Sequence, residues 1–270
     1  MAWSVAGVGS ERGRLLVLCL AFLLSGCVPE EATIRSSALY EEGVRHYLAG
    51  EYAQGAGGLS RAAVEAEDPA VRAKAGLLKG RCHLAMRQFH QAEAAFRRGL
   101  EAGSASKEVR AGLELGLADS LYGQERYPEA ADSYHGLLRR FSGLVPADEA
   151  TFKLAIAYQR SGLWEEARRH FARVASEFPE SPRAEAARRY AERRSSGFAV
   201  QCGAFGSTEA ASRLAGELRK KGFAPRSVPV TTTDGRRLTA VQVGSFRTWT
   251  EAVELRSRLQ AAGFEARIVP

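Results

Sequence analysis

Apolar and small positions recur through the first two thirds of the chain with a period of about 37 residues. Each unit contains an aromatic residue, followed after three positions by a small residue and after seven by a large apolar one. The four aromatic positions are Tyr52, Phe89, Tyr127 and Trp164. Helical spacing places these positions on one side of a helix. The pattern predicts four antiparallel helix pairs over residues 36–181.

The last unit has the clearest boundaries. Its helices are expected at 148–160 and 164–177, because Ser161-Gly162 breaks the first and Phe178-Pro179 stops the second. An arginine-rich capping helix and a linker follow over residues 182–197. In the first repeat, Gly55 and Gly57-Gly58 lie inside the second helix, where each glycine costs about 1 kcal/mol relative to alanine. We therefore expect that helix to be frayed or bent.

This repeat resembles the tetratricopeptide repeat (TPR), although its units are longer than the family's usual length of about 34 residues. The resemblance implies an all-α superhelix with a groove that binds a protein or peptide partner. It does not identify that partner.

Residues 198–270 have a different pattern, in which strands and helices alternate. The segment Gln201-Cys-Gly-Ala-Phe205 recurs 41 residues later as Gln242-Val-Gly-Ser-Phe246. Each half reads strand, amphipathic helix, strand, and Asp234-Gly235 marks a hairpin between the halves. The pattern predicts an α+β domain of ferredoxin-like βαββαβ topology, with helices at about 208–221 and 248–261.

Strand alternation assigns the two faces of this sheet. Four residues should point toward the helices: Val200, Cys202, Val241 and Val243. The opposite face should then carry Ala199, Gln201, Ala240 and Gln242. We expect no other segment to cover that face, so we expect it to be a ligand platform.

The doubled Gln-x-Gly-[Ser/Ala]-Phe motif resembles the SPOR domain of bacterial proteins. That resemblance implies binding of denuded peptidoglycan, the glycan strand left when amidases remove the stem peptides at a division septum. It implies Gln201 as a direct sugar contact and Phe205 as an anchor of the turn after the strand. The full set of expected glycan-binding residues is Gln201, Gly203, Ala204, Phe205, Gln242 and Arg237. Ala204 replaces the serine common in the family, so one hydrogen bond to sugar is missing.

The charge of this segment agrees with an anionic ligand. The whole chain has a net charge of +7, and residues 198–270 hold eleven Lys and Arg against six Asp and Glu. Amidase cleavage leaves a carboxylate on muramic acid, which arginine can bind through forked hydrogen bonds. The candidates are Arg226, Arg236, Arg237, Arg247 and Arg267, and the alternative for any one of them is a solvated surface position. RNA-binding modules share the topology, but the aromatic pair they use is missing from the expected strand positions, so no nucleic acid is expected.

The first 26 residues resemble a lipoprotein signal peptide. Arg12 and Arg14 precede the apolar run 15–24, and Leu24-Ser25-Gly26-Cys27 resembles a lipobox. The resemblance implies that Cys27 is lipidated and that residues 27–35 are a tether to the membrane. Val28 favours the periplasmic face of the outer membrane. The alternative is an ordinary secretory signal with a chance cysteine.

The sequence offers little for catalysis. The histidines lack a metal-ligand spacing such as His-Glu-x-x-His, and Cys82 and Cys202 are expected to be buried free thiols. We expect no enzyme activity, no cofactor and no metal. The predicted function is an adaptor that localises a protein partner on denuded septal glycan. The alternative is a TPR subunit of an outer-membrane protein assembly or envelope-coordination complex.

Overall fold

The computed structural model describes residues 28–270, except 104, 194 and 233. The signal peptide and lipidated Cys27 predicted above lie outside the described residues. The chain divides into two compact units, and the boundary in the sequence falls between Ser120 and Leu121. Within the described part, no helix combines the length and the apolar character needed to cross a membrane.

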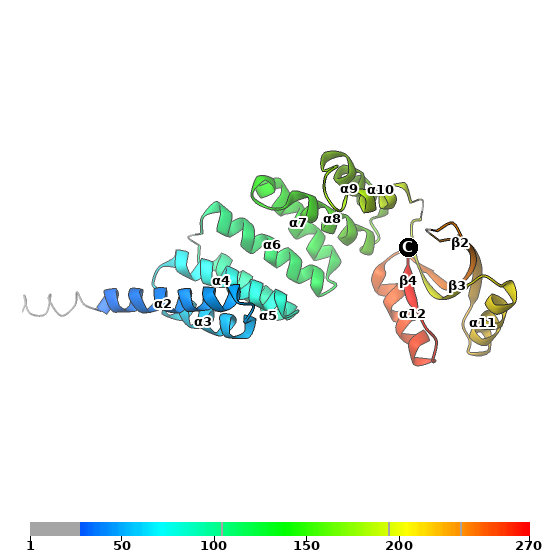
Figure 1. Ribbon diagram of the computed structural model, residues 1–270, viewed down its shortest axis with the longest axis horizontal. Helices are drawn as coiled ribbons and strands as arrows, with labels where there is room; N and C mark the ends of the chain where they lie inside the picture. Colours follow the sequence, from blue (N-terminus) through cyan, green and yellow to red (C-terminus); the bar gives the residue numbers. More distant parts are fainter. Residues whose placement is uncertain (1–27, 104, 194, 233) are drawn as a thin grey trace, which may run out of the picture. The chain divides into compact units, whose positions relative to one another are not determined.

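The first unit is a stack of helices in which sequence neighbours pack side by side (Figure 1). Its helices are α2 (Val28–Leu48), α3 (Tyr52–Glu65), α4 (Pro69–Ala85), α5 (Phe89–Glu101) and the larger part of α6 (Lys107–Gly123). Residues 28–35, expected to be a tether, are the first turns of α2.

Glycines in this unit allow close helix packing. A Cβ atom on Gly58 would lie 3.2 Å from the Gly43 Cα, and one on Gly55 would lie 3.2 Å from the Cys82 Sγ. The predicted fraying of this helix was wrong, because α3 runs unbroken from Tyr52 to Glu65. At Gly55 and Gly58 the cost of glycine is offset by the close contact that the missing side chain permits, whereas a Cβ atom on Gly57 would meet nothing within 4 Å.

The second unit begins with the remaining helices of the array. They are α7 (Tyr127–Phe141), the short 3-10 helix η1 (Ser142–Leu144), α8 (Ala147–Arg160), α9 (Trp164–Glu177) and α10 (Ala184–Glu192). The expected helices of the fourth pair are confirmed to within one residue. Helix α10 packs against α9 and occupies the place of the expected capping helix.

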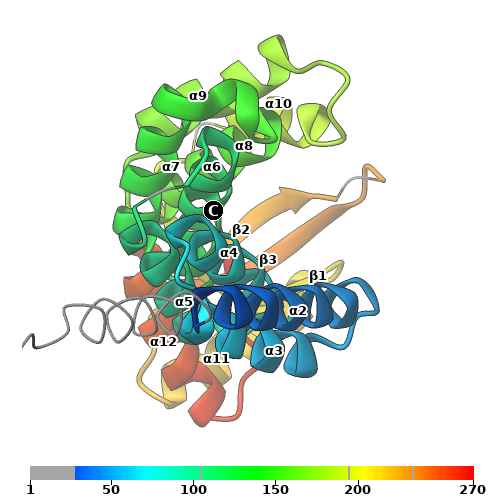
Figure 2. The same cartoon turned by 90° about the vertical axis from the view of Figure 1, so that its left-hand side faces the viewer.

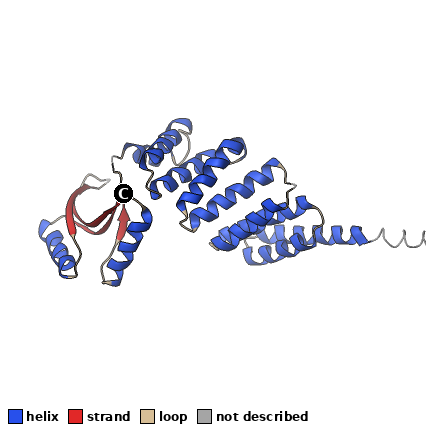
Figure 3. Cartoon of the chain, turned by 180° about the vertical axis from the view of Figure 1, so that it is seen from behind, coloured by secondary structure: helices blue, strands red, loops and turns tan. Residues whose placement is uncertain are grey.

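The C-terminal part of this unit contains every strand of the described chain (Figure 3). Its elements are β1 (Phe198–Phe205), α11 (Thr208–Lys220), β2 (Pro225–Thr231), β3 (Arg237–Phe246), α12 (Trp249–Ala261) and β4 (Arg267–Val269). The strand order is β2-β3-β1-β4, and every pair is antiparallel. Figure 2 shows β2 and β3 as a long hairpin. This is the predicted ferredoxin-like βαββαβ topology.

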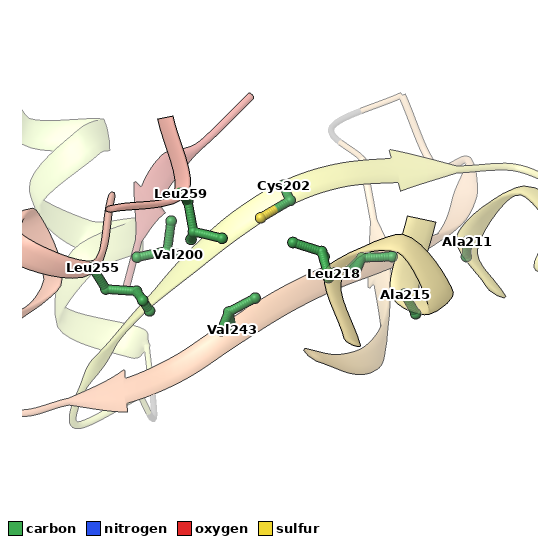
Figure 4. Close-up of a cluster of buried hydrophobic side chains, with 9 residues drawn as sticks. Val200, Cys202, Ala211, Ala215, Leu218, Val243, Leu255 and Leu259 are labelled. Carbon is green, nitrogen blue, oxygen red and sulfur yellow. The ribbon is translucent and has the colours of Figure 1, made fainter. Parts of the chain in front are cut away.

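One face of the sheet forms the domain core with both helices. Val200, Cys202 and Val243 point toward Leu218 of α11 and Leu259 of α12 (Figure 4). The predicted inward face is therefore confirmed, and Cys82 and Cys202 are both buried free thiols. The opposite face carries the candidate site.

Candidate functional site

A row of four polar side chains crosses the outer face of the sheet, one from each strand. In spatial order the residues are Arg226, Gln242, Gln201 and Arg267. Each neighbouring pair is directly opposed in the strand register, so the side chains share one face. Three gaps between strands of about 4.8 Å make the row about 14 Å long.

The two glutamines form the middle of this polar row and the arginines its ends. Gln201 is 7% exposed and Gln242 is 9% exposed, whereas both arginines are exposed. The Arg226 Nη2 donates a hydrogen bond of 3.4 Å to the Gln242 Oε1. Each amide can both donate and accept hydrogen bonds, and each guanidinium only donates. The polar row can therefore bind a flat, hydroxylated ligand that bears negative charge.

The polar row has an internal symmetry that follows from the duplication of the sequence. Gln201 and Gln242 are 41 residues apart, and so are Arg226 and Arg267. Both glutamines were in the expected glycan-binding set, and these two arginines were among the five candidate partners of the glycan carboxylate. Extending the 41-residue offset beyond Gly222 and Gly263 would have singled out the arginine pair.

The glycine and phenylalanine of the doubled motif hold the backbone. A Cβ atom on Gly203 would lie 2.7 Å from the ring of Phe205, which packs on the domain core. In the second half, Gly244 has a φ of +75°, and its Cβ would lie 2.3 Å from the ring of Phe246. Each glycine thus lets the aromatic ring two residues later fold back over the strand. Gly203 and Phe205 therefore shape the strand that carries Gln201.

A family model described as the SPOR domain matches residues 195–270. These residues form a SPOR domain. A tetratricopeptide repeat model matches residues 115–182. The SPOR match indicates peptidoglycan binding, and the TPR match indicates interaction with peptides or proteins.

Several solved structures are similar to part of this chain. The crystal structure of YrrB, described as a TPR protein with an unusual peptide-binding site, is 18% identical with a TM-score of 0.47. The match covers 58% of this chain and 78% of YrrB. The apo form of RapI is 14% identical with a TM-score of 0.50, covering 58% of this chain and 61% of RapI. A structure described as TPR-like repeats of a putative kinesin light chain from Podospora anserina is 16% identical with a TM-score of 0.47, and the match covers 58% of this chain and 83% of that structure. No curated protein matches the sequence.

The residues of the polar row line two separate cavities. Gln201 and Arg267 line a cavity of about 570 Å³, together with the expected site residues Gly203 and Ala204. Arg226 and Gln242 line a second cavity of about 720 Å³. The second cavity corrects one expectation, because residues of α9 and of the linker form its other wall. That part of the sheet face is not bare, since the fourth helix pair lies across from it.

Arg237 lies apart from the other expected site residues. It begins β3, pairs with Thr231 at the hairpin end and is exposed. Alternation along the regular β2–β3 register puts Arg237 on the face of Val241, opposite to Gln242. The structure therefore does not bring Arg237 into the polar row, and Arg267 and Arg226 hold the cationic positions instead.

The helical array has a smaller candidate site of its own. A cavity of about 230 Å³ lies between α3, α4 and α5, with a floor that includes Gly76, Gly99 and Ala95 and a rim of Arg72, Lys79 and Arg98. The Lys79 Nζ donates a 3.0 Å hydrogen bond to the Ser60 Oγ. Burial, and to a lesser degree the charge of Arg98, lowers the pKa of Lys79. Clustered cations around an apolar floor are suited to an acidic group on a partner.

Proposed function

We propose that this protein is a non-catalytic envelope adaptor that binds denuded peptidoglycan with its SPOR domain and a protein partner with its TPR array. The polar row of Arg226, Gln242, Gln201 and Arg267 carries the proposal. The family matches support its two coarser parts, peptidoglycan binding and protein interaction. The septal role is part of this proposal, because denuded glycan is the strand that amidases leave at a division septum.

The preference for denuded glycan rests on charge. Removal of a stem peptide converts a neutral lactyl amide of muramic acid into a carboxylate. Exposed arginines at the two ends of the polar row can bind that carboxylate through charge-assisted hydrogen bonds. The two central amides then pair with hydroxyl and N-acetyl groups of the sugars. Intact strands lack a carboxylate at this position of the sugar and carry bulky peptides there.

The experiment compares retention of the full-length protein on amidase-treated and intact sacculi. We expect stronger retention on the treated sacculi, and loss of that difference in Gln201→Ala. The matched control is Gln91→Ala, an exposed glutamine on α5. Equal retention on both kinds of sacculi, or no retention on either, would refute the proposed specificity.

We place an acidic segment of the protein partner at the cavity between α3, α4 and α5. The charge complementarity of Arg72, Lys79 and Arg98 supports an acidic occupant. Crosslinking in cells with the full chain as bait should yield a protein whose capture is lost in Lys79→Glu. Capture of that protein should persist in the control variant Lys74→Glu, because Lys74 is an exposed lysine on the same helix that does not line the cavity. Identical capture by both variants would argue against this site.

We also propose that the chain is attached to the periplasmic face of the outer membrane through acylated Cys27. The lipobox-like run that ends at Cys27 supports acylation, and Val28 supports the outer membrane. Such an anchor would keep both binding domains within the periplasm, where glycan is accessible. Membrane fractionation of cells that express the full chain tests this localisation, and recovery of the protein in the inner membrane would overturn it.

A further inference from the structure

The SPOR domain and the fourth helix pair are joined by a packed junction. Trp164, the first residue of α9, is 6% exposed and packs on Phe198 with ring centroids 4.8 Å apart. The Trp164 Nε1 donates a hydrogen bond of 3.0 Å to the Arg247 carbonyl oxygen. In return, the Arg247 Nε donates a 3.1 Å bond to the carbonyl oxygen of Gly162. These reciprocal contacts join residues more than 80 positions apart.

An arginine at the end of α8 adds a second connection. The Arg160 guanidinium lies 4.1 Å from the ring centroid of Trp249, the first residue of α12. It also lies 4.8 Å from the ring centroid of Tyr127 and donates a hydrogen bond to the Tyr127 hydroxyl. Cation–π contacts of a partly desolvated guanidinium are favourable. The junction therefore holds the start of α9 against the end of the sheet at which β1 begins and β3 ends.

The cavity of about 720 Å³ lies between the two sides of this junction. Its sheet side includes Arg226 and Gln242 from the polar row. Its array side includes Glu165, Glu166 and Arg168. Glu165 pairs with Arg168, and the Glu166 carboxylate accepts a 2.7 Å bond from Arg169. The side chains of Glu165 and Glu166 are 73% and 40% exposed, so carboxylate oxygens remain accessible to a ligand.

The two walls differ in what they offer to a sugar. Arginine can only donate hydrogen bonds, whereas an ionised carboxylate only accepts them and has about four acceptor positions. A sugar hydroxyl both donates and accepts. A glycan that lay against Arg226 and Gln242 would present its other hydroxyl groups to the array wall. Glu165 and Glu166 on the array wall offer the hydrogen-bond acceptors that the arginines lack.

We propose that the fourth helix pair forms the second wall of the glycan cleft, with Glu165 and Glu166 as acceptors for sugar hydroxyl groups. This inference rests on the proposed glycan-binding function and adds two contact residues outside the SPOR domain. It identifies the ligand of the cavity as a segment of the same glycan strand that crosses the polar row.

The direction in which glycan affinity changes when the two carboxylates are removed distinguishes direct hydrogen bonding from a general effect of charge. Glu165→Ala/Glu166→Ala removes two negative charges near an anionic ligand, so charge alone would strengthen binding. Loss of direct hydrogen bonds would instead weaken it, by about fivefold or more. The matched control is Glu177→Ala/Glu180→Ala, which removes the same charge from exposed positions that do not line the cavity.

The assay measures binding of the full-length variants to purified denuded glycan strands, with thermal unfolding to verify that each variant is folded. We expect weaker binding for Glu165→Ala/Glu166→Ala and unchanged or slightly stronger binding for the control. Unchanged or tighter binding of Glu165→Ala/Glu166→Ala would overturn the composite cleft and leave the proposed function intact. Absence of binding by the wild-type protein would instead overturn the proposed function.

Discussion

Neutralising the ends of the polar row is the sharpest perturbation of the site. Arg226→Gln and Arg267→Gln each remove one cation that the register places beside a glutamine. Both side chains are exposed, so each contact with a glycan carboxylate is screened and stabilises binding by about 1 kcal/mol. A loss of about 1 kcal/mol is roughly a fivefold loss of affinity. The arginines are about 14 Å apart, so the two effects should add, to about 25-fold in the double variant.

The measurement is a titration of denuded glycan oligosaccharides by fluorescence anisotropy, at about 0.1 M and about 1 M salt. Wild-type affinity should fall with salt, because the Debye length shrinks from about 10 Å to about 3 Å. The double variant should show a smaller dependence on salt. Arg237→Gln is the control, since it removes the same charge from the same domain at a position on the other face. An equal loss in Arg237→Gln would show that net charge, and not the polar row, determines binding.

Three further predictions concern the fold, the array and the anchor. Gly244→Ala should destabilise the protein by about 2–4 kcal/mol, since its φ is positive and the new Cβ would meet Phe246. Gly203→Ala introduces only the steric clash with Phe205 and should destabilise the protein by about 1–3 kcal/mol. Urea unfolding measures the loss of stability in both variants, and a larger loss in Gly203→Ala than in Gly244→Ala would contradict this prediction. Burial raises the pKa of Tyr127 to about 12, against the lowering effect of Arg160. Ultraviolet titration should show a tyrosine ionisation step near pH 12, and Tyr127→Phe should reduce that step by one tyrosine. Because the folded-state pKa lies above the ordinary value of 10, the stability contribution of this tyrosine is complete below pH 10 and declines as pH rises toward 12. Cells that express the full chain should incorporate labelled palmitate into it, and Cys27→Ser should abolish the label; persistence of the label would exclude this acylation site.

Local spacing in the sequence was enough to predict most elements of the fold. The 37-residue period predicted the helix pairs, and the helix from Trp164 to Glu177 has the expected bounds. The 41-residue duplication predicted the sheet topology and the side of the sheet that faces the helices. These features depend on contacts that repeat along the chain, so a periodic pattern records them directly. One local expectation was wrong, because Gly55 and Gly58 of α3 allow close helix packing that sequence propensity does not describe.

The composition of the candidate site was decided by tertiary structure. The strand register, with a bulge between Gln201 and Gly203, brings Gln201 beside Gln242 and puts an arginine at each end of the row. Arg237 looked equivalent in sequence, but the same register puts it on the opposite face. The junction at Trp164 joins residues more than 80 positions apart, and no local pattern connects them. Side-chain chemistry along the chain thus determined what this protein can bind, and the pairing of distant strands and helices determined which residues can bind it together.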